Sequence, residues 1–293
     1  MLKVSFVAIL VSLVIWVGDP ALAVKVESVG VASIYGQPDP SAIAPGAGAM
    51  TSRPDGLGYW IATTEGVVVE FGQAQHYGDM KGTALNKPIV GMVATSTGRG
   101  YWLVASDGGI FSFGDATFYG STGALTLNSP IVGMTATHTG TGYWLVAADG
   151  GVFSYGDATF YGSTGAIKLN RPIVAMLSTK TSQGYWLLAD DGGIFTFGDA
   201  HFHGSGPGRG FSESFAGLIP TLDGSGYALV HTNGTVTPFG ASSLSGASAC
   251  DPWPVTDMSI AGEGAVVLRT PDVVPNEAPS KHSAQMDARY LES

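Results

Sequence analysis

The chain has 293 residues, which is enough for one large all-β domain or two small ones. Its formal net charge is −10 at pH 7; only 12% of its residues are charged, whereas 43 are glycine. This acidic balance argues against a nucleic-acid partner, which needs a basic surface to displace counterions, and against electrostatic docking on anionic lipid.

The first segment has the pattern of a secretory signal peptide. Lys3 precedes an almost wholly apolar run over residues 4–17, and Ala21-Leu22-Ala23 follows as a small-x-small cleavage site. An uncleaved anchor is the alternative, but the run is shorter than the ~20 residues that span a bilayer. We therefore predict a signal peptide over residues 1–23, an exported protein, and no membrane span after cleavage.

The only cysteine is Cys250, so no intramolecular disulfide can form. An exported protein without disulfides depends on its core for stability, which suits a bacterial exported protein. The Cys250 thiol is either buried and inert or exposed and able to crosslink two copies.

Residues 24–270 repeat with a period of 42 residues. Gly-Tyr pairs recur at this spacing without slippage, and Trp follows in all but the last: Gly58-Tyr59, Gly100-Tyr101, Gly142-Tyr143, Gly184-Tyr185 and Gly226-Tyr227. A period of about 40–45 residues is typical of propeller blades with four strands each.

Each repeat contains four short segments that we predict as strands a, b, c and d, counted outward from a central channel. In one repeat they are residues 88–95, 100–106, 108–114 and 116–121, and turn residues separate them. Glycine recurs in the b–c turn and at the ends of strands c and d. This recurrence predicts positive φ or close backbone approach at those positions.

The two ends of the repeat region supply the halves of one further blade. Residues 24–36 align with strands c and d, and residues 254–270 align with strands a and b. The sequence therefore predicts an all-β, six-bladed propeller over residues 24–270, with four antiparallel strands per blade and a sixth blade closed by the termini. Such closure hides sheet edges that invite aggregation. Residues 271–293 are polar and without period, and we expect a flexible tail.

The words GYWLVASDGGIFSFGDATFYGSTG, residues 100–123, resemble a known repeat of about 42 residues with the pattern GYWLVxxDGGIFxFGDAxFYGS. It is found in exported envelope proteins of actinobacteria, and the resemblance covers residues 24–270. In that family such repeats often accompany cell-wall hydrolase or other envelope domains. No catalytic residues are assigned to the repeat itself, so the resemblance implies an envelope propeller without naming an activity.

The Tyr-Trp pairs of strand b have two interpretations. Aromatic faces can stack on sugar rings, but adjacent strand residues point to opposite faces, so at most one of each pair is free. We expect both rings to pack between blades, because large aromatics dominate cores. The same expectation applies to a ring of strand a side chains: Met50, Met92, Met134, Met176, Leu218 and Ile260.

One polar residue per blade occupies the b–c turn: Glu65, Asp107, Asp149, Asp191 and Asn233. A ring of carboxylates at a channel mouth could bind a cation or a polar ligand. Asp-Gly is also a standard tight-turn pair, and we expect the turn role here. The same expectation holds for the c–d turn residues Asp115, Asp157 and Asp199. No calcium loop is present, and the sequence predicts no metal and no cofactor.

Residues 199–214 depart from the repeat. His203 replaces a tyrosine, His201 is added, Arg209 lies in the altered loop, and His231 stands near the next b–c turn. A His-x-His pair can ligate a metal, and irregular loops often carry function. No carboxylate is placed to complete a metal site, so divergence of one blade is the expected interpretation.

The sequence contains no Ser-His-Asp order, no G-x-S-x-G elbow, no H-E-x-x-H and no phosphate loop. The leading hypothesis is a non-catalytic binding module of the cell envelope or extracellular space, which recognises a glycan or an envelope protein through its d–a and b–c loops. The alternatives are a hydrolase or lyase with a channel-mouth site near the fifth blade, and a structural scaffold or adhesin. The candidate ligand-binding residues are Asp107, Asp149, Asp191, Asn233, His203, His231 and Arg209.

Overall fold

The computed structural model describes residues 25–29, 34–39, 46–211, 213–221, 226–240, 255–261 and 264–269. For residues 25–29, 256–261 and 264–269 it describes the backbone. The predicted signal peptide (1–23), the predicted tail (271–293) and Cys250 lie outside the described residues.

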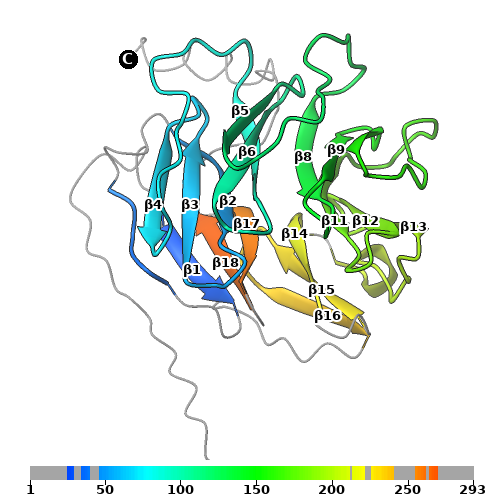
Figure 1. Ribbon diagram of the computed structural model, residues 1–293. Helices are drawn as coiled ribbons and strands as arrows, with labels where there is room; N and C mark the ends of the chain where they lie inside the picture. Colours follow the sequence, from blue (N-terminus) through cyan, green and yellow to red (C-terminus); the bar gives the residue numbers. More distant parts are fainter. Residues whose placement is uncertain are drawn as a thin grey trace, which may run out of the picture.

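The described chain forms six three-stranded antiparallel sheets (Figure 1). Five of them are consecutive in the sequence, with the Gly-Tyr strand in the middle of each: β2 (Ala47–Ser52), β3 (Gly58–Thr63) and β4 (Val68–Gly72); β5 (Ile89–Ala94), β6 (Gly100–Ala105) and β7 (Ile110–Gly114); β8 (Ile131–Ala136), β9 (Gly142–Ala147) and β10 (Val152–Gly156); β11 (Ile173–Ser178), β12 (Gly184–Ala189) and β13 (Ile194–Gly198); β14 (Phe215–Pro220), β15 (Gly226–His231) and β16 (Val236–Gly240).

The remaining sheet joins the two ends of the described chain. β1 (Lys25–Val29) pairs with β18 (Gly264–Arg269), which pairs with β17 (Val255–Ala261), all antiparallel. Figure 1 shows the blue β1 beside the orange β17 and β18. This sheet therefore pairs a strand from the start of the described chain with two strands from its end.

The first strands of the sheets contact one another in the order β2, β5, β8, β11, β14 and β17, and β17 also contacts β2. Backbone hydrogen bonds link the same neighbours. Ser106, after β6, donates its N–H to the carbonyl of Pro88 (2.9 Å) and accepts the N–H of Ile131 at the start of β8 (2.8 Å). Equivalent pairs of bonds form at Thr64, Ala148, Asp190 and Thr232. This radial repetition of antiparallel sheets is the arrangement of a β-propeller.

The prediction of a fourth strand is wrong wherever the structure describes the predicted segment; residues 241–254, which follow β16, lie outside the described residues. Residues 74–79, 116–121, 158–163 and 200–205, together with 34–37, are here called the outer segments, and none of them pairs as a strand. Their backbone groups bond to side chains instead. Trp102 of one sheet donates its Nε1–H to the carbonyl of Thr117 (2.8 Å), and Tyr143 of the next sheet donates its hydroxyl to the carbonyl of Gly120 (2.6 Å).

This pair of bonds, here called the Trp–Tyr clamp, recurs around the molecule. The tryptophan bonds of 2.8–2.9 Å join Trp60 to Gln75, Trp102 to Thr117, Trp144 to Thr159 and Trp186 to His201. The tyrosine bonds of 2.5–2.6 Å join Tyr59 to Gly36, Tyr101 to Gly78, Tyr143 to Gly120, Tyr185 to Gly162 and Tyr227 to Gly204. Each of the outer segments 74–79, 116–121, 158–163 and 200–205 is thus fixed between two successive sheets, and the segment 34–37 is held by Tyr59.

Burial confirms that the aromatic pairs belong to the core. The five tyrosines are at most 1% exposed, and the four tryptophans at most 6%. Met50, Met92, Met134, Met176 and Leu218 are also buried. The side chain of Ile260 lies outside the described residues. Burial raises the pKa of Tyr101 to about 12 and also raises the pKa of Tyr143, so both hydroxyls stay protonated and able to donate.

Two glycines show why these positions recur. Gly108, in the turn between β6 and β7, has φ of 78°, and a Cβ there would lie 1.7 Å from Thr122 Oγ1. Gly120 has φ of 140°, and a Cβ there would lie 2.4 Å from the ring of Tyr155. The prediction of positive φ and close approach is confirmed at both positions.

Tyr143→Phe tests the clamp. The hydroxyl donates to Gly120 O and accepts the N–H groups of Tyr119 and Gly120, both at 3.1 Å. Its removal leaves these backbone groups unpaired, so we expect the free energy of unfolding in urea to fall by about 1–3 kcal/mol. Tyr119→Phe is the control, because that hydroxyl makes one longer bond of 3.3 Å to Gly140 O. Equal losses in the two variants would contradict the role of the clamp.

Candidate functional site

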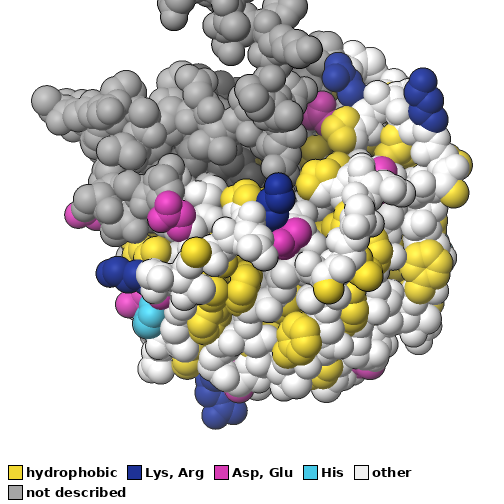
Figure 2. Space-filling view, turned by 90° about the horizontal axis from the view of Figure 1, so that it is seen from above, with side chains coloured by type: hydrophobic (Ala, Val, Ile, Leu, Met, Phe, Trp, Pro, Cys, Tyr) yellow, Lys and Arg dark blue, Asp and Glu magenta, His cyan; other side chains and the backbone are white. Residues whose placement is uncertain are grey.

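The sheets have two ends of different character. At one end lie the turns between the second and third strands of each sheet, together with the loops that lead into the next sheet; we call this end the loop face. At the other end, the opposite face, lie the turns between first and second strands and the starts of the outer segments. Figure 2 shows the molecule from above the view of Figure 1, and the described part of this surface carries few charged side chains, scattered among uncharged and hydrophobic ones.

On the opposite face the aspartate carboxylates accept hydrogen bonds from threonine hydroxyls. Thr137, Thr139 and Thr141 donate to Asp157 at 2.5–2.8 Å. Asp115 accepts from Thr95 and Thr97, and Asp199 accepts from Thr179 and Thr181. Burial acts to raise the pKa of Asp157, but the three hydroxyls outweigh it and lower the pKa. These carboxylates tie two turns of one sheet together, a structural role.

On the loop face each aspartate uses one oxygen. Oδ1 of Asp107, of Asp149 and of Asp191 accepts the N–H of the glycine two residues later at 2.9–3.0 Å, as tight-turn chemistry predicts. Asn233 makes the equivalent bond to the N–H of Thr235 at 2.9 Å. Within the described residues, Oδ2 of the three aspartates has no hydrogen-bond partner. The turn role therefore leaves one carboxylate oxygen per turn free for a ligand.

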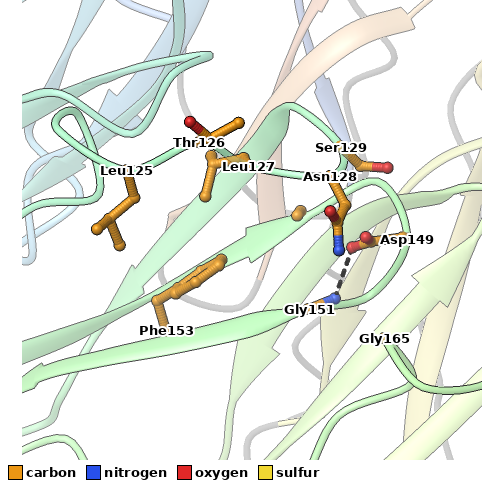
Figure 3. Close-up of a pocket in the computed structure, with 10 residues that line it drawn as sticks. Leu125, Thr126, Leu127, Asn128, Ser129, Asp149, Gly151, Phe153 and Gly165 are labelled. Atoms are coloured by element: carbon orange, nitrogen blue, oxygen red, sulfur yellow. Dashed lines mark hydrogen bonds between the residues drawn. The ribbon is translucent and has the colours of Figure 1, made fainter.

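A cleft of 370 Å³ opens between the loop of residues 125–129 and the turn that joins β9 to β10 (Figure 3). Leu125, Leu127 and Phe153 supply its apolar part, and Asn128 and Asp149 its polar part. Asn128 and Asp149 both line the cleft, and the dashed line in Figure 3 marks the bond from the Gly151 N–H to the Asp149 carboxylate. The Asn128 side chain has no hydrogen bond to any described residue. The cleft thus offers apolar walls beside uncommitted polar groups.

The lining of this cleft recurs with the 42-residue period. Four positions keep their residue type across three successive sheets: Leu85, Leu127 and Leu169; Asn86, Asn128 and Asn170; Asp107, Asp149 and Asp191; Phe111, Phe153 and Phe195. A second cleft of 510 Å³ lies along the loop of residues 81–88, on the side of the preceding sheet, and is lined by Glu65, Lys81 and Lys87 among others. The loop face therefore carries related clefts of different chemical lining.

The three histidines of the altered region are not brought to one site. The rings of His201 and His203, in the outer segment 200–205, lie 6.5 Å apart between centroids. His203 packs against Tyr227 at 5.5 Å between ring centroids, near the start of β15, whereas His231 is the last residue of that strand. His231 is four positions after Tyr227 in the strand, roughly 13 Å at ~3.3 Å per residue. The guanidinium of Arg209 lies 4.1 Å from the ring centroid of Phe239. These side chains do not form one constellation at a channel mouth.

His231 is 3% exposed and packs between two aromatic rings. Its ring centroid lies 4.1 Å from that of Phe215 and 5.1 Å from that of Phe211. Nε2 is 2.8 Å from Thr237 Oγ1, and Nδ1 is buried without a partner among the described residues. Burial lowers the pKa of His231 from its ordinary 6.5, and Glu213 partly opposes the shift. The sequence flagged this histidine as a ligand candidate; its place in a core was recognisable only from the fold.

Among the described residues, no group of three or more His, Cys, Asp or Glu side chains could hold a metal ion. No helix in the described ranges is long and apolar enough to span a membrane.

No family model matches the chain, and no curated protein matches it. Solved structures do. The β-propeller domain of Cps50 (Swd1) from Myceliophteria thermophila is 9% identical, with a TM-score of 0.49 over 77% of this chain and 82% of that chain. The C-terminal WD40 domain of Sif2 is 13% identical, with a TM-score of 0.43 over 79% of this chain and 70% of that chain. At these values the likeness says nothing about function.

His231 makes the stability of the protein depend on pH. The unfolded chain binds the proton near 6.5 and the folded chain only at lower pH, so the stability that the neutral ring contributes is present above pH 6.5 and falls below it. Between the pKa of His231 in the unfolded chain and its lower pKa in the folded chain, we expect the free energy of unfolding to fall by at most about 1.4 kcal/mol for each pH unit of acidification. Urea unfolding from pH 7.5 to 5 measures it. His231→Gln should flatten this part of the profile, whereas His201→Gln, at an exposed site, should not; equal profiles in all three proteins would contradict the assignment.

Proposed function

We propose that this chain is a six-bladed β-propeller closed by its own termini, and that it acts as an exported, non-catalytic binding module. The pairing of β1 with β18 and the contacts of β17 with both β14 and β2 support the closure. The signal-peptide pattern over residues 1–23 supports export to the cell envelope or beyond.

The cleft of Figure 3 carries the proposal of binding. The buried Tyr and Trp rings of the clamp and the opposite-face aspartates are already committed to the fold, whereas Asn128 and one oxygen of Asp149 are not. Leu125 is 58% exposed at the cleft edge, and its counterpart in the next loop, Ile167, is equally exposed. Apolar surface beside unpaired polar groups is the composition of a recognition site. A protein or glycan ligand of the envelope fits such a surface.

Repetition of the lining strengthens the proposal. Shallow sites that recur around one face bind weakly one at a time, but a ligand that reaches two of them gains effective concentration for the second contact. The hydrolase hypothesis finds no comparable support, because His203 and His231 contact opposite ends of β15.

A double variant of the cleft, Leu125→Ser with Asn128→Ala, tests the proposal. The purified protein is applied to arrays of envelope glycans and of peptides. We expect at least one ligand whose binding the cleft variant weakens about ten-fold, because several contacts are lost together.

The control carries matched changes at exposed positions of the opposite face, Leu57→Ser with Gln183→Ala. It should bind like the unaltered protein. Ligands that bind the cleft variant as well as the unaltered protein, or that are lost from the control instead, would overturn the assignment of the loop face.

A further inference from the structure

The cleft between residues 125–129 and the β9–β10 turn has apolar walls and an anionic end. Leu125, Leu127 and Phe153 lie along one part of it, and Asp149 lies at the other (Figure 3). A side chain with a long hydrocarbon stem and a charged head matches this division, since such side chains lay their stems on apolar surface and keep the head in a polar environment.

The charge of Asp149 has no cationic partner in the described part of the chain. Salt bridges there join Arg53 to Asp55 and His76 to Glu70. Asp149 Oδ1 accepts the N–H of Gly151 and Oδ2 is unbonded. Asn128, which also lines the cleft, carries an amide oxygen that can accept a second hydrogen bond from a cationic head. An ammonium or guanidinium group is therefore the complement of this end of the cleft.

The two equivalent surfaces already contain cations of their own. Lys87 stands where the Figure 3 cleft has Ser129, and in the next loop Lys168 and Arg171 replace Thr126 and Ser129. The loop of residues 123–130 contains no Lys or Arg. Of the three related surfaces, the one around Asp149 is therefore the one whose carboxylate no loop cation accompanies.

The charge of the whole chain acts in the same direction. A net charge of −10 raises the encounter rate with a basic partner and disfavours an acidic one. We infer that the cleft around Asp149 accepts a lysine or arginine side chain from a basic segment of a partner protein. This inference rests on the proposed binding role of the loop face and names the chemistry of its ligand.

Asp149→Asn is the decisive variant. Asparagine keeps the turn, because Asn233 makes the same bond to a backbone N–H in the fifth sheet. Asp107→Asn removes one negative charge at the equivalent turn of the preceding sheet, whose loop contains Lys87, so it is a matched control for net charge. The probe is acetyl-tetralysine amide, with acetyl-tetraglutamine amide as the neutral comparison, followed by NMR titration of the full-length protein at 150 mM salt.

We expect the lysine probe to shift the Gly151 amide resonance, Asp149→Asn to weaken its binding about five-fold, as for a partly exposed ion pair, and Asp107→Asn to change it less than two-fold. The glutamine probe should bind more weakly than the lysine probe. Equal effects of the two aspartate variants, or equal binding of the two probes, would overturn the inference.

A second probe examines the apolar walls. Replacing each lysine with 2,3-diaminopropionate keeps the charge and shortens the stem, so binding should weaken if the stem contacts Leu127 and Phe153. Equal affinity of the long and short probes would overturn this part. If the binding of array ligands depends on Leu125 and Asn128 but is not changed by Asp149→Asn, the proposed function is supported and the cation site is contradicted. If no ligand depends on the loop face, both proposals are contradicted.

Discussion

The Trp–Tyr clamp is the interaction on which the rest of this molecule depends. Tyr143 and Trp144 are neighbours on β9, so their side chains point to opposite faces of the sheet. Tyr143 therefore holds the outer segment that comes before its sheet, and Trp144 holds the one that follows. Each Gly-Tyr-Trp sequence bonds two outer segments, and four of the described outer segments are held by two sheets. The sheets are thus joined by directional bonds as well as by buried area.

The free polar groups of the loop face are those that the hydrogen bonds of the fold do not use. The clamp takes carbonyls and amides of the outer segments, the threonines take the opposite-face aspartates, and residues such as Ser106 relay backbone bonds from sheet to sheet. Buried polar groups have to be paired, so all of these are committed to the fold. Asn128 and one oxygen of Asp149 remain uncommitted at the edge of an apolar cleft. These free polar groups support the proposed recognition role of the loop face.

The clearest failure of prediction was the fourth strand, and its cause lies in side chains of two different sheets. Residues 116–121 have the composition of a strand, yet the carbonyls of Thr117 and Gly120 accept hydrogen bonds from the side chains of Trp102 and Tyr143. A buried donor from another sheet competes with the adjacent strand for the same backbone carbonyls. The repeat pattern of the sequence does not show which of the two bonds forms. His231 was misleading for the same reason: its ring is surrounded by Phe211 and Phe215, which converge on it only after folding.

The positions of the sheets, the tight turns and the obligatory glycines could be predicted from the sequence alone. The 42-residue spacing marked the sheets, Asp-Gly marked the tight turns, and recurrent glycine marked positions such as Gly120, where no Cβ fits. These features depend on neighbours a few residues away or on exact repetition. Which polar groups stay free depends instead on partners in other sheets, and it took folding to separate Asp157, bonded by three threonines, from Asp149, which keeps an oxygen for a ligand. Both are aspartates beside a glycine in a turn, and the difference lies in which side chains the packing of the sheets brings within reach.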